Sequence, residues 1–171
     1  MARISKKIAL TDAELDELMS SSWNMRIATV GAGGRINLTP MWFGWVNGKI
    51  YFTGRGQKIV NLRRNAQASI LVDKNERFPE LVGAMFQGSG QVLEDAAAEA
   101  ADPDLEEARM VLGTKYAGGH GEPAEPQRRD TTAAGETNRW VVFTPDRLVS
   151  WDNPKIAALQ AARATAGAGD S

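Results

Sequence analysis

Two tight-turn signals near the start of the chain separate three segments with the pattern of β-strands. Residues 31–34 (GAGG) supply the positive φ angles that a tight reversal needs. Asn47-Gly48 is the dipeptide most typical of a two-residue hairpin turn, and aromatic residues lie on both sides of it. We therefore expect two hairpins that join three consecutive strands, over residues 24–30, 35–46 and 49–53. A chain organised in this way forms an antiparallel sheet.

Two features predict irregular places in the sheet. Pro40 lies within the second expected strand, and proline cannot donate a hydrogen bond to a neighbouring strand. It therefore marks an edge, a bulge or a break that faces a ligand. Gly88 and Gly90 weaken a later apolar segment, which indicates curvature or the close approach of another group.

The rest of the chain completes a mainly β (α+β) fold. A capping box begins the first helix, because Thr11 and Glu14 can satisfy each other's free amides. Further elements follow from the hydrophobic pattern. Helices are expected over 11–21, 57–65 and 95–116 (broken near Asp102-Pro103), and strands over 68–73, 84–94 and 138–151 (with a turn at 144–146). About six or seven antiparallel strands with short flanking helices predict a small barrel, which avoids exposed edges.

One domain, residues 1–153, accommodates all of these elements. Residues 117–137 are polar and rich in Gly and Pro, so they bury too little apolar surface to offset the entropy of ordering. We expect a mobile loop there. Residues 154–171 are rich in Ala and Gly, and we expect a frayed helix or a disordered tail.

Composition excludes several classes of function. The 20 Lys and Arg residues nearly balance the 21 Asp and Glu residues, which argues against a nucleic-acid-binding protein. Cysteine is absent and His120 is the single histidine, so thiolate chemistry, a metal site and a Ser-His-Asp triad are not expected. No stretch approaches the roughly 18 apolar residues of a membrane span, and the first residues contain no apolar run long enough for a signal peptide, so none is expected. A cytoplasmic location is therefore expected.

The strongest candidate for a binding site lies between the third strand and the helix that follows. Helix N-termini attract phosphate through free amides and the positive end of the helix dipole. Here glycines allow close approach of an anion, and two cations and a hydroxyl add to the attraction. The residues of this corner are Thr53, Gly54, Arg55, Gly56 and Lys58. The alternative is an ordinary turn before a solvated basic helix face.

Aromatic residues gather on the two strands that lead into this corner. Alternation places Trp42 on the face opposite Phe43 and Trp45. One face is expected to pack inward, and the other to line an apolar pocket or a subunit interface. A phosphate cradle beside an aromatic slot suits a phosphorylated ring cofactor.

Residues 34–73 resemble the flavin/deazaflavin oxidoreductases of the pyridoxamine 5′-phosphate oxidase-like split β-barrel superfamily. The segment NLRRNAQAS, the preceding Lys58 and the closing FTPDRLVSWDNPK (143–155) are most similar to the coenzyme F420-dependent branch. The resemblance covers about residues 10–155 and implies a split antiparallel β-barrel that forms a homodimer, with cofactor sites at the subunit interface.

The resemblance also implies roles for particular residues. The cofactor phosphate would be held at Arg55, Gly56, Lys58 and Asn61, with Thr53 and Gly54 beside them. The ring would lie against the strand of Leu38, Thr39, Pro40, Met41 and Trp42. Gln87 and residues 151–155 would approach the cofactor or substrate of one or the other protomer.

Two departures from the family pattern argue against vitamin B6 oxidation. Leu38 stands where a histidine is common, and the Arg/His pair that binds substrate in true pyridoxamine-phosphate oxidases has no match. We expect transfer of a hydride from reduced coenzyme F420 to an activated double bond of a small apolar substrate. The alternatives are an FMN enzyme of the same fold, a non-catalytic carrier of either cofactor and, ranked last, a haem protein. Arginines 63 and 128 could meet the glutamyl tail that distinguishes F420 from FMN.

Overall fold

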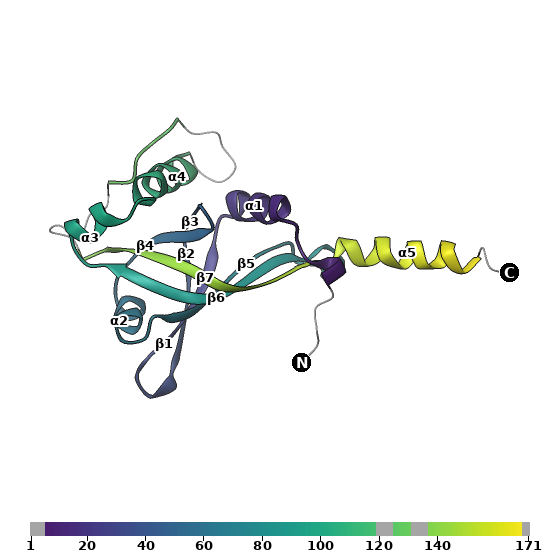
Figure 1. The fold of residues 1–171 in the computed structure, drawn as a ribbon, viewed down its shortest axis with the longest axis horizontal. Coiled ribbons are helices and arrows are strands. Elements are labelled where there is room, and N and C mark those ends of the chain that lie inside the picture. Colours follow the sequence, from purple (N-terminus) through teal and green to yellow (C-terminus); the bar gives the residue numbers. More distant parts are fainter. Residues whose placement is uncertain (1–5, 119–124, 131–136, 169–171) are drawn as a thin grey trace.

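The computed structural model describes residues 6–118, 125–130 and 137–168. Within them, seven strands form one antiparallel sheet in the order β2-β1-β5-β6-β7-β4-β3. The strands are β1 (Met25–Val30), β2 (Ile36–Met41), β3 (Gly44–Val46), β4 (Lys49–Gly54), β5 (Gln67–Lys74), β6 (Val82–Leu93) and β7 (Arg139–Asp152). The α-helices are α1 (Asp12–Ser21), α2 (Gln57–Arg64), α3 (Ala96–Ala101), α4 (Leu105–Ala117) and α5 (Pro154–Ala168). The curled sheet confirms the predicted mainly β split barrel (Figure 1).

The helices lie around the sheet in a simple arrangement. In the view of Figure 1, α1 and α4 lie on one side of the strands, α2 lies on the other, and α5 projects from the end. The predicted capping box is present at α1, where the Thr11 hydroxyl accepts from the Glu14 amide and the Glu14 carboxylate accepts from the Thr11 amide. The predicted break between α3 and α4 is also present.

The segment expected as one strand over 35–46 is two strands at opposite edges of the sheet. β2 pairs with β1, whereas β3 pairs with β4. The chain therefore passes from one edge to the other at Trp42 and Phe43, not at Pro40. Pro40 lies inside β2, where its missing N–H is tolerated because β2 is an edge strand. The prediction of a single strand was wrong because short-range alternation does not show which strands become neighbours.

The turn expected at 144–146 is instead a β-bulge in one continuous strand. Gln87 is opposite Arg147 and Gly88 is opposite Pro145, so Asp146 is the extra residue on β7. Gly88 lies against this bulge, since a Cβ on it would be 2.2 Å from the Thr144 carbonyl oxygen. The predicted close approach of another group to Gly88 is therefore confirmed.

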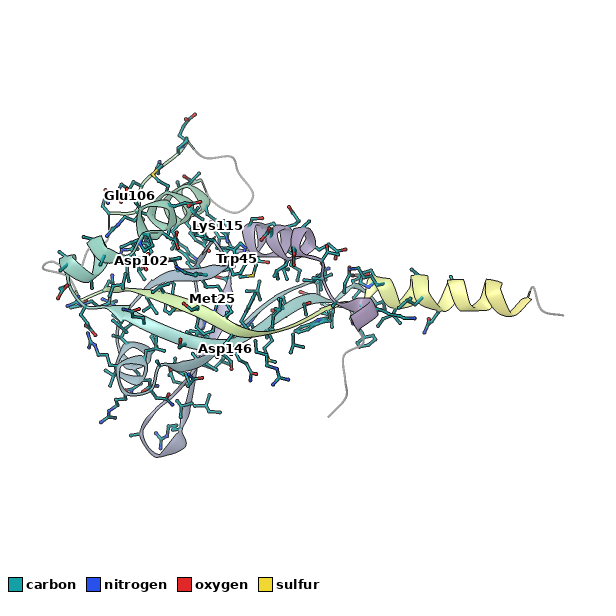
Figure 2. The ribbon with its side chains drawn as sticks, viewed as in Figure 1. Met25, Trp45, Asp102, Glu106, Lys115 and Asp146 are labelled. Carbon is teal, nitrogen blue, oxygen red and sulfur yellow. The ribbon has the colours of Figure 1, made fainter. Side chains whose placement is uncertain are left out.

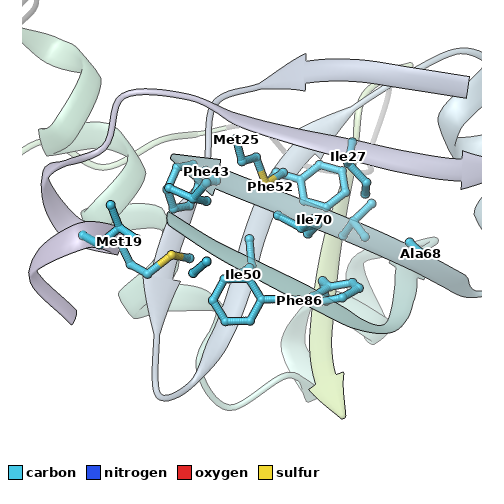
Figure 3. Close-up of a cluster of buried hydrophobic side chains, with 14 of the residues drawn as sticks. Met19, Met25, Ile27, Phe43, Ile50, Phe52, Ala68, Ile70 and Phe86 are labelled. Atoms are coloured by element: carbon cyan, nitrogen blue, oxygen red, sulfur yellow. The ribbon is translucent and has the colours of Figure 1, made fainter. Parts of the chain in front are cut away.

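The core fills the inside of the curled sheet. Figure 3 shows apolar side chains of β1, β4, β5 and β6 meeting Met19 of α1 and Phe43. A second cluster lies on the other face of β3 and β4, where Tyr51 and Trp140 are buried beneath α4. At Tyr51 this face is therefore covered by α4 of the same chain, whereas Trp42 is 44% exposed. The expectation that one face lines a pocket or a subunit interface stays a prediction.

Two predicted flexible regions fall partly outside the described residues. Of the expected mobile loop 117–137, residues 119–124 and 131–136 are not described, and they include His120. Residues 125–130 lie along α4, where the Arg129 amide donates to the Arg109 carbonyl at 3.0 Å. In the expected tail, residues 154–168 form α5.

Lys155 at the start of α5 is tied to the first helix of the fold. Its ammonium forms an ion pair with Glu14 and donates to the Ala9 carbonyl. The hydrogen bond from Lys155, followed by that from the Thr11 amide, lowers the pKa of Glu14 from 4.5 to about 2. The Glu14 carboxylate therefore favours the folded state above pH 4.5, and this contribution is lost as the pH falls toward 2.

We expect Glu14→Gln to reduce the acid sensitivity of the fold. Between pH 5 and pH 2.5 the melting temperature of the variant should fall by less than that of the wild type, because the variant has no carboxylate to protonate. Thermal melts followed by circular dichroism at both pH values measure this. Glu17→Gln, on the exposed surface of the same helix, is the control. Equal acid sensitivity of Glu14→Gln and the wild type would contradict the claim that the ionised Glu14 carboxylate stabilises the fold.

Candidate functional site

The corner between β4 and α2 has the geometry of an anion site. Gly56 is the N-cap of α2, with φ at +74°, a value that favours glycine, and no side chain caps the helix. Its carbonyl accepts from the amides of Ile59 and Val60 at 3.1 and 3.3 Å. The first-turn amides before them keep their capacity to bind a ligand. No atom of the chain lies within 4 Å of a Cβ position on Gly56, so the corner is open on that side.

Two cations lie at this corner. Arg55 is exposed, and Lys58 is partly buried, with its ammonium donating to the Arg55 carbonyl at 3.0 Å. Burial of the Lys58 ammonium, and then the charge of Arg55, lower the pKa of Lys58 from its usual value. An anion at the corner would relieve both effects, because it would balance the desolvated ammonium and the neighbouring guanidinium.

The corner is joined to the strand predicted to carry the ring. A Cβ on Gly54 would lie 3.3 Å from Cδ of Lys58 and 3.7 Å from Cε of Met41. Gly54 therefore lets the Lys58 stem and the end of β2 come together. Thr53 is half-buried at the end of β4, next to this contact.

Asn61 lies beneath α2 rather than on its surface. It is fully buried, its amide donates to the Thr29 hydroxyl at 3.0 Å, and its carbonyl accepts from Gln57 at 2.8 Å. These contacts fix α2 against β1. The structure therefore does not bring the Asn61 side chain to the surface of the corner, and its contact with a phosphate stays a prediction.

β2 presents alternate residues to solvent. Leu38 (65% exposed) and Pro40 are exposed, and so is Trp42 (44%) just beyond the end of the strand, whereas Thr39 and Met41 are half-buried. Exposed apolar side chains along one edge strand offer a flat surface to a ring.

Gln87 shares the exposed face of the sheet with Leu38. The register places Leu38 opposite Ala28, Ala28 opposite Ser69, and Ser69 opposite Gln87. Directly opposed residues point to the same face, and three inter-strand steps span about 14 Å along the sheet. Within one chain, Gln87 is therefore on the correct face but is not adjacent to β2.

Trp42 is fixed by two aromatic residues that the sequence analysis missed. It stacks on Tyr116 of α4, with ring centroids 4.4 Å apart and an angle of 4° between the planes. Trp23 meets both rings edge-on. The Tyr116 hydroxyl accepts from the Phe43 amide at 2.9 Å and donates to the Trp23 carbonyl at 2.8 Å. Positions 23, 42 and 116 are far apart in sequence, so no local pattern signals this cluster.

Other predicted contributors already have partners within the chain. Lys155 binds Glu14, as described above, and Trp151 packs on Gly83, where a Cβ would lie 2.4 Å from the indole. Each of the two arginines predicted to meet the glutamyl tail of F420 forms a bidentate interaction with a glutamate. Arg63 binds Glu94 and Arg128 binds Glu106. Neither guanidinium is therefore a free positive charge.

Neither a metal site nor a membrane helix is present in the described residues. No group of three or more His, Cys, Asp or Glu side chains is placed to hold a metal ion in the ranges that the structure covers. None of the described helices is long and apolar enough to cross a membrane.

Comparison with known proteins gives a sequence family and a set of similar folds. A sequence model described as pyridoxamine 5′-phosphate oxidase matches residues 11–144. No curated protein matches the sequence.

Three solved structures illustrate the similarity of fold. A conserved hypothetical protein from Mycobacterium tuberculosis has a TM-score of 0.71 and 23% identity, over 91% of this chain and 93% of that chain. The haem storage protein HutZ from Vibrio cholerae has a TM-score of 0.62 and 16% identity, over 82% and 94%. A structure named F420 reductase has a TM-score of 0.55 and 17% identity, over 78% and 94%. At these identities the likeness establishes the fold alone.

Proposed function

The chain belongs to the pyridoxamine 5′-phosphate oxidase family, and from this premise we propose that it is a coenzyme F420-dependent oxidoreductase. The proposed reaction transfers a hydride from the reduced deazaflavin to an activated double bond of a small apolar substrate. The observation that carries the proposal is the uncapped, glycine-lined N-terminus of α2, with Arg55 and Lys58 beside it. A cytoplasmic location is part of the same proposal.

The corner suits a phosphate group by its chemistry. A phosphate oxygen bound there would accept hydrogen bonds from the first-turn amides of α2 and would lie near the positive end of the helix dipole. Lys58 would donate to it from a partly buried position, where the interaction gains strength from the reduced contact with water. Arg55 would add a charge from the solvent side.

The rest of the chain would orient the ring and exclude water. Met41, Pro40 and Leu38 run along β2 from the corner, so a ring held by its phosphate would lie on this strand. Trp42 closes the end of that surface and is itself held by the stack on Tyr116. The cofactor, when bound, supplies the hydride chemistry, and the protein supplies anchoring, orientation and an apolar surrounding.

The exposed face of β2 also supports the proposal of a homodimer. Ile36 is 68% exposed and Leu38 is 65% exposed, on the same face of the strand. Apolar side chains aligned in this way mark a surface that another molecule covers. We propose that a second copy covers it and completes each site. Gln87 of the partner subunit would then approach a ring from which Gln87 of the same chain is separated by β1 and β5.

FMN is the nearest alternative cofactor. It also carries a ribityl phosphate and a tricyclic ring, so the corner suits both molecules. Because Arg63 and Arg128 are paired with glutamates, they do not favour the acidic tail of F420. The choice of F420 therefore rests on the resemblance of residues 34–73 and 143–155 to the F420-dependent branch.

Visible spectra of the protein mixed with each cofactor separate these alternatives. The proposal predicts a perturbed deazaflavin band that stays with the protein on gel filtration, and no retention of FMN. Retention of FMN alone would favour the FMN enzyme. A screen of quinones, enones and tetrapyrroles for oxidation of the reduced deazaflavin then tests catalysis. Tight binding without turnover on any acceptor would indicate a carrier.

A further inference from the structure

An apolar cavity lies away from the phosphate corner, between α1, β3, α4 and residues 125–130. Its volume is about 600 Å³, within the range of small-molecule sites. The walls are mostly apolar, and the main contributors are Met19, Trp45, Met110, Val111, Lys115 and Pro126. In Figure 2, Lys115 is labelled beside α4 on the side toward α1, and Trp45 below it, above the long strands of the sheet. The cavity shares no lining residue with the corner at 53–58 or with β2.

Lys115 brings a positive charge to this apolar cavity. Its ammonium donates to the carbonyls of Met19 and Phe43 at 3.2 and 3.4 Å and lies 4.0 Å from the centre of the Phe43 ring. Burial and then the charge of Lys74 lower the pKa of Lys115 to about 8. Lys115 is therefore mostly protonated at neutral pH. Its contacts do not fully compensate the free-energy cost of removing the ammonium from water.

The described residues offer this charge no ion-pair partner. Among the residues that the structure describes, neither Lys115 nor Lys74 forms an ion pair. Asp16, the acid of α1 that contacts a cavity residue, accepts a hydrogen bond from the Trp45 indole at 2.7 Å. Desolvated charges in proteins are normally paired, so a partly buried ammonium with no ion pair to the described residues, beside a cavity, favours an anionic occupant.

A purely structural role accounts for only part of this arrangement. Lys115 and Lys74 both contact the C-terminal end of α1, which has no basic residue of its own in its last turn. This contact explains a lysine near Met19. It does not explain an open apolar cavity beside Lys115, whose ammonium contacts two carbonyls and the Phe43 ring but no carboxylate among the described residues.

The cavity has a defined outer wall. A Cβ on Gly113 would lie 2.0 Å from the Gln127 carbonyl oxygen, so only glycine lets residues 125–130 lie directly on α4. The Gln127 amide donates to the Thr114 hydroxyl at 3.1 Å, and Pro126 lines the cavity.

We propose that this cavity binds a small apolar carboxylate, with its hydrocarbon part among the apolar walls and its carboxylate paired with Lys115. The proposal is independent of the F420 function, because it uses none of the residues of the phosphate corner. A carboxylate supplies a counterion that the described residues do not provide, and it adds an acceptor for the ammonium. The apolar walls contribute affinity in proportion to the hydrocarbon surface that they remove from water.

Calorimetric titration with octanoate and 1-octanol, on protein without added cofactor, tests the proposal. The two probes share one hydrocarbon chain and differ in charge. We expect the wild type to bind octanoate at least tenfold more tightly than 1-octanol, and Lys115→Met to lose this preference. Lys115→Arg should retain it, because the charge remains.

Met110→Trp provides a test that keeps Lys115. Met110 is 37% exposed at the cavity, so a larger ring there should obstruct the cavity and weaken both probes. The proposal would be overturned if the wild type showed no preference for octanoate, or if Lys115→Met kept the preference. Equal binding of both probes to Met110→Trp and to the wild type would also overturn it.

Discussion

Replacing Lys58 with alanine is expected to weaken the binding of coenzyme F420 by about 10- to 150-fold. This corresponds to about 1.5–3 kcal/mol, the usual contribution of a hydrogen bond to a charged group. The effect is large because Lys58 is the partly buried cation of the corner, and Arg55 is exposed to screening by water. A titration followed by deazaflavin fluorescence measures the change.

Arg64→Ala is the matched control for this prediction. Arg64 is an exposed cation at the opposite end of the same helix, so its removal changes the net charge equally without touching the corner. We expect its affinity for the cofactor to stay within about twofold of the wild type. If Lys58→Ala and Arg64→Ala behaved alike, the charge of α2 would act only at long range, and Lys58 would not be part of the site.

Replacing Gly88 with alanine is expected to destabilise the fold by about 3 kcal/mol or more, the upper end of the usual cost of overpacking. The added Cβ would lie 2.2 Å from the Thr144 carbonyl oxygen and 2.9 Å from Cα of Pro145. Both atoms belong to the backbone of β7 at the bulge, so no side-chain rotation relieves the clash. For a chain of this size the melting temperature should fall by about 6–12 °C.

Gly90→Ala on the same strand provides the comparison. Its Cβ would lie 3.0 Å from a methyl group of Leu62, which can move by a small rotation. We therefore expect a clearly smaller fall in melting temperature, measured by calorimetry or circular dichroism. Similar losses for the two variants would show that the cost comes from the loss of glycine in a strand and not from the bulge.

Local chemistry explains which parts of the fold could be predicted. The Asn47-Gly48 turn and the Thr11–Glu14 capping box depend on neighbouring residues alone, and both are present. The prediction of one strand over 35–46 was wrong because the fate of this segment depends on distant parts of the chain. β2 and β3 separate to opposite edges because of the closure of the whole sheet, and no feature of residues 42 and 43 reveals it.

In the candidate site, too, features set by neighbouring residues could be predicted, and features set by the packing of distant elements could not. A glycine-rich corner with two cations is contiguous in sequence, and the structure places its residues together. Asn61 is close to the corner in sequence, but its position on α2 points its side chain into the core, where it contacts Thr29. The stack of Trp42 on Tyr116 depends on how α4 packs on the sheet, so it could be found only from the structure.

The central claim is that the corner at the start of α2 binds the phosphate of a redox cofactor. It is tested most directly by comparing FMN with riboflavin, which differ in the phosphate alone, and F420 with its ribityl deazaflavin, which lacks the phosphate and the glutamyl tail attached through it. We predict that for at least one pair the phosphorylated member binds the wild type at least tenfold more tightly, and that Lys58→Ala reduces this advantage. Equal affinity of both members in both pairs, or an advantage that Lys58→Ala leaves unchanged, would contradict the claim.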